Sequence, residues 1–431
     1  MRNRLPSKVI RIRAGWHWVL LARLAGFLAM CCVATNWATT IYAQQGLTTW
    51  PGFRGERGDG HVAKFPQSQF HPKMLWRSAL PTQGVGGVAA TADFVIASSR
   101  SVDDQSDVFV CFDPITGAQL WQLRYAAPGQ LDYGNSPRAT PLISDPFVYL
   151  LGAFGDLKCV DIDSGEVKWS KHLVKDLGGQ LPVWGYGWSP TLVDGHLIVM
   201  PGGKKCSIAA LSVTDGSVIW QTPGETAAYA TPQLATWNDR PQIIAYDTKS
   251  LGGWDSVTGV RLWSVIPGEP NDFNVPTPIV LPNGLIVASE NNGTRRYEVD
   301  SSGVVNPEPT SQVKTIDPDA HTPVVIGSQL IVAERELISL DLDKQLAVRW
   351  RIKDRALRAH NSLIVGGDEL LIVTQSGEVL LVEVSKNAGE IKARHKLGGD
   401  ADYLLSHAAF SGNTLFVRAE GSLQAWALWE E

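Results

Sequence analysis

The chain has 431 residues, of which 44% are hydrophobic and 19% charged, and it contains 41 glycines and 16 tryptophans. This composition allows a packed core and is too apolar for a disordered chain. The formal net charge is only −5, and no Lys/Arg block interrupts the body of the chain to supply a phosphate-binding surface. We therefore expect a globular protein without a nucleic-acid partner.

The first 43 residues differ from the rest. They hold Lys and Arg but no acidic residue, then an apolar run over residues 24–33, and Ile41-Tyr42-Ala43 resembles a cleavage site. We interpret residues 1–43 as a secretory signal peptide. The alternatives are an uncleaved inner-membrane anchor, in which the charge of Arg23 would cost about 2.5 to 3.5 kcal/mol, and a lipid-modified Cys31. Each of these predicts an exported protein.

Residues 44–72 precede the first repeat. The stretch TWPGFRGERGDGHV places Trp50, Phe53 and Arg54 before several glycines. We expect an irregular lead-in segment that packs over one face of the domain. A docking peptide for a partner is the alternative.

One phrase then recurs along the chain: an Asp or Ser, a Gly four residues later and a Trp eight residues later. The four closest copies begin at Asp113, Asp161, Ser212 and Asp255, and weaker copies follow to the C-terminus. Gly at that position suits a hairpin loop that needs a positive φ angle. The recurring phrase therefore predicts a repeated β-hairpin.

Each repeat reads as four strands in about 43 residues, which is the size of a propeller blade. The last repeat stops after its third strand, and residues 72–80 supply an additional strand before the first repeat. We predict an all-β, eight-bladed β-propeller over residues 73–431, in which the N-terminal strand completes the last blade. Such closure removes exposed sheet edges.

The repeated phrase resembles that of the PQQ-type β-propeller family. The resemblance implies that the outer-strand tryptophans dock between blades, at Trp76, Trp121, Trp169, Trp220, Trp263 and Trp350. It also implies two functional classes: quinoprotein dehydrogenases that hold pyrroloquinoline quinone (PQQ) and Ca²⁺, and, more similar in size, propellers like the outer-membrane β-barrel assembly factor, which bind protein without the cofactor.

The sequence lacks most of what a quinoprotein site needs. Only Cys111, Cys159 and Cys206 lie outside the signal segment, so no adjacent cysteine pair is present there. Asp132, Asp272 and Asn274 are scattered candidates for the cofactor site, and blades this short leave little room for pocket-building inserts. We expect no cofactor and no catalysis, with a PQQ- and Ca²⁺-dependent dehydrogenase, or a metal-dependent enzyme that uses the same axial funnel, as the alternative.

Three histidines share one position on consecutive blades, in the loops that should line a funnel at one end of the axis: His321, His360 and His407. Neutral imidazoles there could bind Zn²⁺ or another transition metal, with Asp319 or Asp402 as carboxylate neighbours. The alternative is a polar lining that hydrogen-bonds to backbone or water.

A second group of funnel candidates combines aromatic and charged side chains: Asp132, Tyr133, Arg138, Trp184, Tyr186, Trp188 and Tyr229. Exposed aromatic residues with an Arg could anchor a peptide or glycan. Alternatively, the tryptophans fill the funnel.

We therefore expect a monomeric, non-catalytic propeller in the periplasm or outside the cell. Its partner would be a protein, peptide or polysaccharide of the bacterial cell envelope. Attachment to the inner membrane through an uncleaved N-terminal segment is the alternative location, and a purely structural module of a larger assembly is the alternative role.

Overall fold

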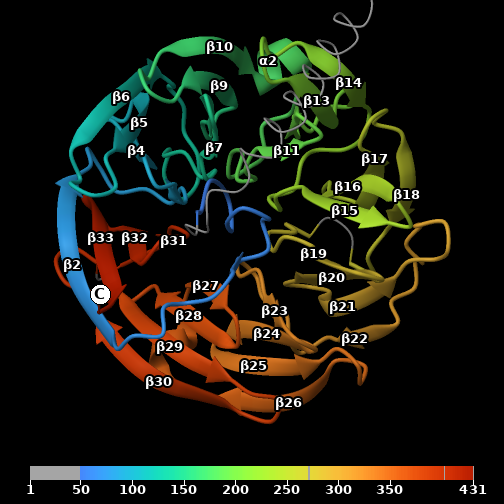
Figure 1. Cartoon of the computed structure of the whole chain (residues 1–431). Helices are drawn as coiled ribbons and strands as arrows, with labels where there is room; N and C mark the ends of the chain where they lie inside the picture. Colours follow the sequence, from blue (N-terminus) through green and yellow to red (C-terminus); the bar gives the residue numbers. More distant parts are fainter. Residues whose placement is uncertain (1–48, 270–271, 402, 431) are drawn as a thin grey trace, which may run out of the picture. The chain divides into compact units, whose positions relative to one another are not determined.

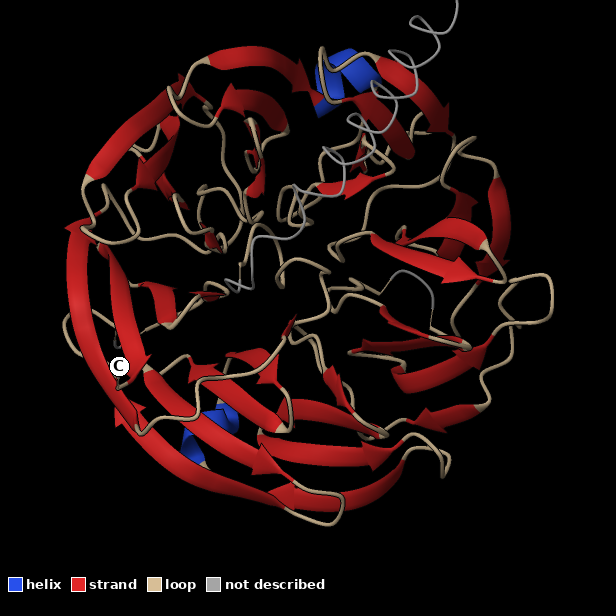
Figure 2. Ribbon diagram, in the orientation of Figure 1, coloured by secondary structure: helices blue, strands red, loops and turns tan. Residues whose placement is uncertain are grey.

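The computed structural model describes residues 49–269, 272–401 and 403–430, and the predicted signal peptide lies outside them. These residues form a ring of eight sheets, antiparallel except for one short added strand, around a central axis (Figure 1). Strands and loops make up nearly all of the ring (Figure 2). The prediction of an all-β, eight-bladed propeller is confirmed.

Blades 1 to 4 follow one another along the chain, each with its first strand innermost and its fourth outermost. Their strands are β3 (Ala89–Ala90), β4 (Val95–Arg100), β5 (Ser106–Phe112) and β6 (Gln119–Ala126); β7 (Leu142–Ser144), β8 (Phe147–Leu151), β9 (Asp156–Asp161) and β10 (Val167–His172); β11 (Thr191–Val193), β12 (His196–Val199), β13 (Ile208–Ser212) and β14 (Val218–Thr222); and β15 (Gln233–Trp237), β16 (Arg240–Tyr246), β17 (Leu251–Asp255) and β18 (Arg261–Val265).

Blades 5 to 7 continue the pattern, and blade 8 takes its fourth strand from the N-terminal side of the chain. Their strands are β19 (Ile279–Leu281), β20 (Gly284–Ser289), β21 (Gly293–Glu298) and β22 (Ser311–Val313); β23 (Val324–Ile326), β24 (Gln329–Glu334), β25 (Glu336–Asp341) and β26 (Ala347–Ile352); β27 (Asn361–Gly366), β28 (Glu369–Thr374), β29 (Glu378–Val384) and β30 (Gly389–Lys396); and β31 (Ala409–Ser411), β32 (Thr414–Arg418) and β33 (Ser422–Trp429) with β2 (Phe70–Ala79).

The ring is closed by the pairing of β2 with β33. The two strands are antiparallel, with Arg77 opposite Gln424 and Ala79 opposite Ser422. β2 begins at Phe70, slightly before the expected start of the propeller. Because β2 covers the outer edge of β33, the two ends of the propeller segment are held in one sheet.

The core follows from the strand pattern. The second and third strands of the blades are buried along most of their length, as in β5, where every residue is buried. Outer strands alternate instead, as in β30, whose residues are alternately half-buried and exposed. This period of two places one face of each outer strand on the neighbouring blade and the other in solvent.

The outer-strand tryptophans show why the phrase is repeated. The indole Nε1–H of Trp121 donates to the carbonyl of Ile162 in blade 2 (2.6 Å), and Trp169 makes the equivalent bond to Val213 in blade 3 (2.9 Å). Trp76 and Trp220 also reach the following blade, through Pro114 and Ser256. A tryptophan of one blade thus bonds to the hairpin turn of the next.

Two outer-strand tryptophans bond within their own blade instead. Trp263 donates to Gln242 (2.8 Å) and Trp350 to Gln329 (3.0 Å). The ring of Trp350 still lies next to Gly389 of blade 7. In these two blades a buried glutamine accepts the bond that a turn carbonyl accepts elsewhere.

Helix is limited, within the described ranges, to α2 (Leu173–Leu177) and the 3₁₀ turn η1 (Arg355–Arg358). Both are loop insertions that the sequence analysis did not predict. None of the helices among these residues has the length and hydropathy needed to cross a membrane.

Residues 49–69 pack against the inner strands. The short strand β1 (His61–Val62) pairs in parallel with β27 as a fifth strand of blade 7. Trp50 forms backbone bonds with Ala90 of blade 1, and the buried Arg54 donates to the carbonyl of Pro323 beside blade 6 (2.9 Å). This segment therefore joins blades on different sides of the axis.

Candidate functional site

One end of the propeller carries the loops expected to line a funnel. Successive strands of each blade are antiparallel, so the loop from one blade to the next opens at the same end as the loop between the second and third strands. We call this end the loop face. Every sequence-predicted funnel residue lies in the first kind of loop.

Four aromatic rings from four successive blade connections gather on this face. Trp184 stacks on Phe273 with ring centroids 4.1 Å apart, and Tyr229 lies 5.0 Å from Trp184 on a tilted plane. Tyr133 meets Trp184 edge-on at 5.9 Å. We call Tyr133, Trp184, Tyr229 and Phe273 the aromatic cluster. Phe273 was not predicted as a site residue, although it lies in one of the loops expected to line the funnel.

Tyr133 is the most exposed member of the cluster, with 82% of its surface accessible, against 42% for Phe273. Its backbone has φ 63°, a left-handed conformation that costs a non-glycine residue about 1 to 2 kcal/mol. The guanidinium of Arg138 holds this loop by donating to the carbonyls of Asp132, Gly134 and Ser136, each at 2.8 Å. The loop thus fixes an aromatic side chain in solvent.

Arg138 therefore has a structural task in this loop. Burial lowers the pKa of its guanidinium, but its bonds to three carbonyls keep the donors satisfied. The Asp132 side chain is exposed, and the bond that Arg138 makes to this residue is to its backbone.

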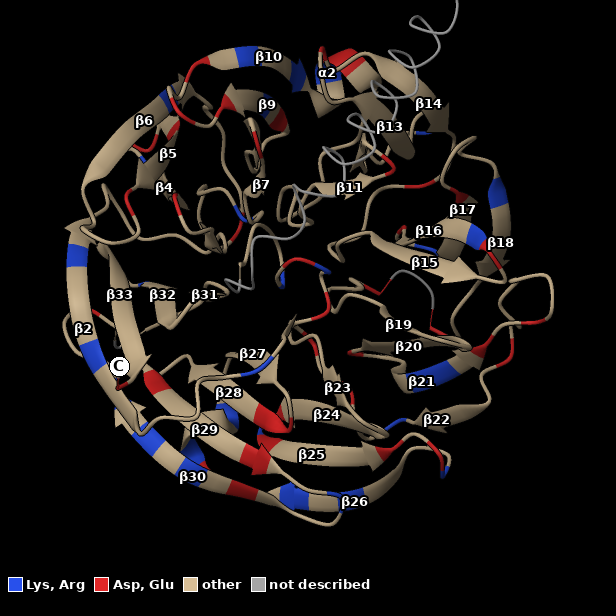
Figure 3. Cartoon of the chain, viewed as in Figure 1, with Lys and Arg blue, Asp and Glu red and all other residues tan. Residues whose placement is uncertain are grey.

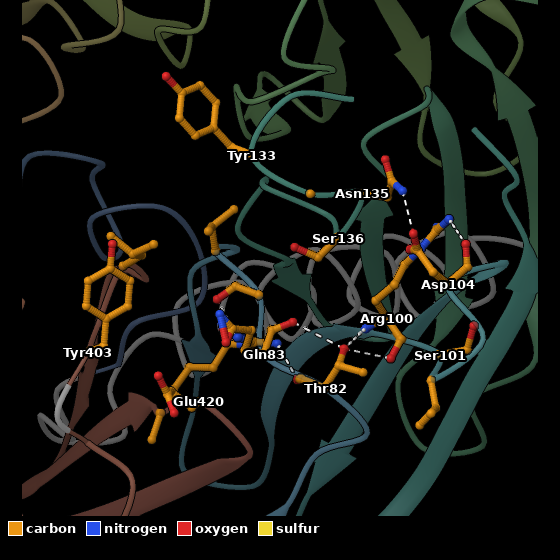
Figure 4. A pocket seen from close by; sticks show the side chains of 17 residues that line it. Thr82, Gln83, Arg100, Ser101, Asp104, Tyr133, Asn135, Ser136, Tyr403 and Glu420 are labelled. Carbon is orange, nitrogen blue, oxygen red and sulfur yellow. Dashed lines mark hydrogen bonds and ion pairs between the residues drawn. The ribbon is translucent and has the colours of Figure 1, made fainter. Parts of the chain in front are cut away.

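Two pockets flank the aromatic cluster. One, of about 320 Å³, is lined by Trp184 and Phe273 together with the acidic side chains of Asp272, Glu290 and Asp319. The other, of about 460 Å³, lies between blades 8 and 1 (Figure 4). Tyr133 lines both pockets, so they are adjacent parts of one surface.

The walls of the larger pocket are held by two buried arginines. Arg100 donates to Asp107 (2.6 Å) and to Asp104 (2.8 Å; Figure 4). Arg418 donates to the carbonyls of Thr82, Gly84 and Ser98, and burial lowers the pKa of its guanidinium to about 10. These bonds hold the loops of blades 8 and 1 together in the wall of the pocket.

The three predicted histidines do converge near the axis. His321 stacks on His360 with centroids 5.1 Å apart, and His407 meets His360 edge-on at 5.6 Å. Burial and the neighbouring rings hold the pKa of His360 well below its usual value, and burial with the nearby Arg54 charge lowers that of His407 to about 4. The rings of His360 and His407 are therefore neutral at pH 7.

The lead-in segment closes the axis against these rings. The Phe53 ring meets His407 edge-on at 5.1 Å, and Arg54 is buried among the inner strands. The lead-in segment thus covers one side of the histidine group. Asp402, one of the expected carboxylate neighbours, lies outside the described residues, whereas Asp319 Oδ1 is 3.9 Å from Nδ1 of His321.

Two of the predicted funnel residues are placed elsewhere. Tyr186 and Trp188 are fully buried, with no accessible surface, and belong to the core cluster of blades 2 to 4. The Tyr186 hydroxyl donates to the carbonyl of Pro201 (2.9 Å). Their large apolar rings pack in this core, so neither side chain is open to a ligand.

The residues of this face do not fit a PQQ and Ca²⁺ site. The carboxylate of Asp272 accepts bonds from Asn291 and Asn292 and is buried. Phe273 stacks on one face of Trp184, and Tyr229 also contacts this ring, so the stacked face is not open to a quinone. Cys111, Cys159 and Cys206 are each buried and unpaired, and burial raises the pKa of their thiols.

Charge is distributed around the ring. Lys and Arg of the outer strands pair with acidic residues, most of which lie on neighbouring strands and turns (Figure 3); Lys392 pairs with Glu383 and Glu390, for example. In the view of Figure 3 no extended basic patch forms over the described residues. The surface is suited to a partner of mixed charge rather than to a polyanion.

Sequence comparison finds relatives of one kind. The chain is similar to outer membrane protein assembly factor BamB from Escherichia coli (strain K12), with 23% identity over 66% of this chain and 72% of the relative. The protein of the same name from Yersinia pestis is 25% identical over 68% of this chain and 70% of the relative.

Solved structures share the fold. The crystal structure of BamB from Moraxella catarrhalis covers 83% of this chain and 100% of its own with 15% identity and a TM-score of 0.57. Quinohemoprotein alcohol dehydrogenase from Comamonas testosteroni covers 89% of this chain and 81% of its own with 11% identity and a TM-score of 0.64. At such identities both likenesses show the propeller fold alone.

A family model described as outer membrane protein assembly factor BamB matches residues 104–345, more than half of the chain. The matched range runs from blade 1 to blade 6 and contains the four closest copies of the repeated phrase. The chain therefore belongs to the PQQ-type repeat propeller family described by that model.

Proposed function

We propose that this protein is a non-catalytic propeller of the bacterial cell envelope that binds a protein partner through its loop face. The observation that carries the proposal is the Tyr133 loop. A bulky aromatic residue is held in a left-handed conformation, in solvent, by the carbonyl bonds of Arg138. Backbone strain of this kind is often found where a side chain is presented for binding.

The surroundings of Tyr133 support a polypeptide ligand. Aromatic anchors next to fixed polar groups are the usual composition of the energetic centre of a protein interface. Here the aromatic cluster adjoins a pocket of about 460 Å³ that has polar and apolar lining residues and whose walls are held by Arg100 and Arg418. An extended segment could place an apolar side chain on the cluster and its backbone in the pocket.

Family membership supports the envelope as the place of action. The similar proteins are named for outer membrane protein assembly, and we infer that this chain acts in the periplasm in an assembly of that kind. The quinoprotein alternative is not favoured, because Asp272 and Trp184 are engaged with protein groups. Incubation with PQQ and Ca²⁺ should therefore give no saturable change in absorption.

Co-purification from the native envelope tests the proposal. Tagged wild-type protein is compared with the double variant Tyr133→Ala, Phe273→Ala and with Ile115→Ala. Ile115 is 80% exposed and lies in a hairpin turn at the opposite end of blade 1, so it controls for loss of a surface hydrophobic residue. Proteins lost only from the double variant support the proposal. An unchanged set of partners, or retention of a polysaccharide instead, would overturn it.

A further inference from the structure

Beside the aromatic cluster, three side chains of blade 6 point their donor atoms at one another. The donor atoms of Asp319, His321 and Glu334 all lie within 4.8 Å of one another. Nδ1 of His321 is 3.4 Å from Oε2 of Glu334 and 3.9 Å from Oδ1 of Asp319. Asp319 and His321 come from the loop that enters β23, and Glu334 from the end of β24.

The histidine is buried without a hydrogen-bond partner. His321 is only 6% exposed, and neither of its ring nitrogens is hydrogen-bonded. Oε2 of Glu334, the oxygen that faces the ring, also lacks a partner. Leaving such polar atoms buried and unbonded is unfavourable, so their arrangement favours the binding of a ligand.

The spacing fits a metal ion better than direct hydrogen bonds. Nitrogen and oxygen atoms that share a hydrogen bond lie about 2.7 to 3.2 Å apart, which is shorter than both distances here. Two ligands at about 2.1 Å from a tetrahedral Zn²⁺ lie about 3.4 Å apart. The His321 to Glu334 distance has this value, and a small rotation of the exposed Asp319 would complete the set.

We propose that Asp319, His321 and Glu334 form a binding site for a divalent transition metal such as Zn²⁺. One imidazole and two carboxylates are a ligand set that Zn²⁺ accepts, with a fourth position left for water or a partner side chain. The ion would enter from the pocket that Asp319 lines. Glu334 Oε1 faces the exposed Arg335 at 3.6 Å, which leaves Oε2 for the metal.

This site differs from a set of three histidines on the axis. His360 stacks against His321, and His407 lies beyond it, but the compact donor group found among the described residues contains neither. If the three histidines bound the ion, His407→Gln would lose metal binding and Glu334→Gln would keep it. The site proposed here predicts the reverse.

Calorimetric titration of the purified, chelator-treated full chain with ZnCl₂ tests the proposal, with elemental analysis of bound metal. We expect one ion per chain, and a loss of affinity of at least about 100-fold in His321→Asn and in Glu334→Gln, since even outer partners of a metal site contribute 10- to 100-fold. His407→Gln should bind as the wild type does. Equal affinity in the wild type and Glu334→Gln, or loss only in His407→Gln, would overturn the proposal.

A second measurement needs no variant. Co²⁺ added to the wild-type protein should give visible absorption bands of a four- or five-coordinate ion without thiolate bands, because the ligand set contains no cysteine. A spectrum identical to that of Co²⁺ in buffer would contradict the site. Circular dichroism of each variant distinguishes a lost ligand from a lost fold.

Discussion

The indole of Trp121 lies directly over Gly165 of the following blade, where a Cβ atom on the glycine would be 2.9 Å from the ring. Gly165 also has φ 73°, which an L side chain rarely adopts. The Gly and Trp positions of the repeated phrase therefore meet in space. One blade supplies the tryptophan, and the next supplies the turn that leaves room for it.

This contact predicts that Gly165→Ala destabilises the protein. The new methyl group would meet the strain of a positive φ, about 1 to 2 kcal/mol, and would displace the Trp121 ring. Overpacking of this kind typically costs about 1 to 3 kcal/mol more. The free energy of unfolding, measured by urea denaturation, should fall by the sum of the two.

Gly195→Ala is the matched control. Gly195 has nearly the same φ, 76°, but no heavy atom lies within 4 Å of the position that its Cβ would take. The control should show only the cost of the backbone strain. If both variants lose the same stability, contact between tryptophan and turn contributes nothing.

Arg138→Met should release the Tyr133 loop. Each bond from a charged donor is worth about 1.5 to 3 kcal/mol, and methionine keeps the apolar stem while it removes all of the donors. Local opening should rise by about tenfold or more, since 1.4 kcal/mol corresponds to tenfold. Chymotrypsin cleavage after Tyr133, followed by mass spectrometry, measures this opening.

Arg335→Met is the control for that experiment. The Arg335 side chain is 85% exposed on the same face, and its loss should leave cleavage after Tyr133 unchanged. Equal cleavage of the wild type and Arg138→Met would show that the loop is held by other contacts.

His407 should make the protein less stable in acid. Its pKa is about 4 in the folded protein, because of burial, Arg54 and His321, and about 6.5 in an unfolded chain. Between these values the unfolded state binds more protons, so the free energy of unfolding falls as pH falls from 6.5 to 4. The contribution of this residue to the loss is up to about 3 kcal/mol.

The variant His407→Gln isolates this effect. Carboxylates and the buried His360 also titrate in acid, but they are present in both proteins. The groups that face the His407 ring are Phe53, Arg54, His321, His360 and Ser362. The variant should lose stability less steeply between pH 6.5 and 4, and parallel stability curves for the two proteins would contradict the prediction.

The fold could be predicted from the sequence because the repeated phrase encodes contacts between blades. Gly117, Gly165, Gly216 and Gly259 each have a positive φ and lie against a tryptophan of the preceding blade. Such contacts have a fixed spacing, so they appear as a period. The closing strand could be predicted as well, because one strand was missing at the C-terminus and one was in excess at the other end.

The candidate site was less predictable because a loop sequence does not show whether an aromatic side chain faces solvent or the core. Tyr133 is exposed and Tyr186 is buried, although both lie in Gly-containing loops of the same kind. Glu334 was missed because only the loops between blades were searched. The loops between second and third strands open on the same face, and including them would have brought Glu334 next to His321.

The most direct test of the loop face is photo-crosslinking in the native envelope with a benzophenone amino acid at position 133. The same probe at position 115, in the exposed turn at the far end of blade 1, is the control. The account predicts a discrete crosslinked protein from position 133 that is absent from position 115 and is lost when Trp184→Ala is added. No crosslink at 133, or the same products from both positions, would contradict binding through this face.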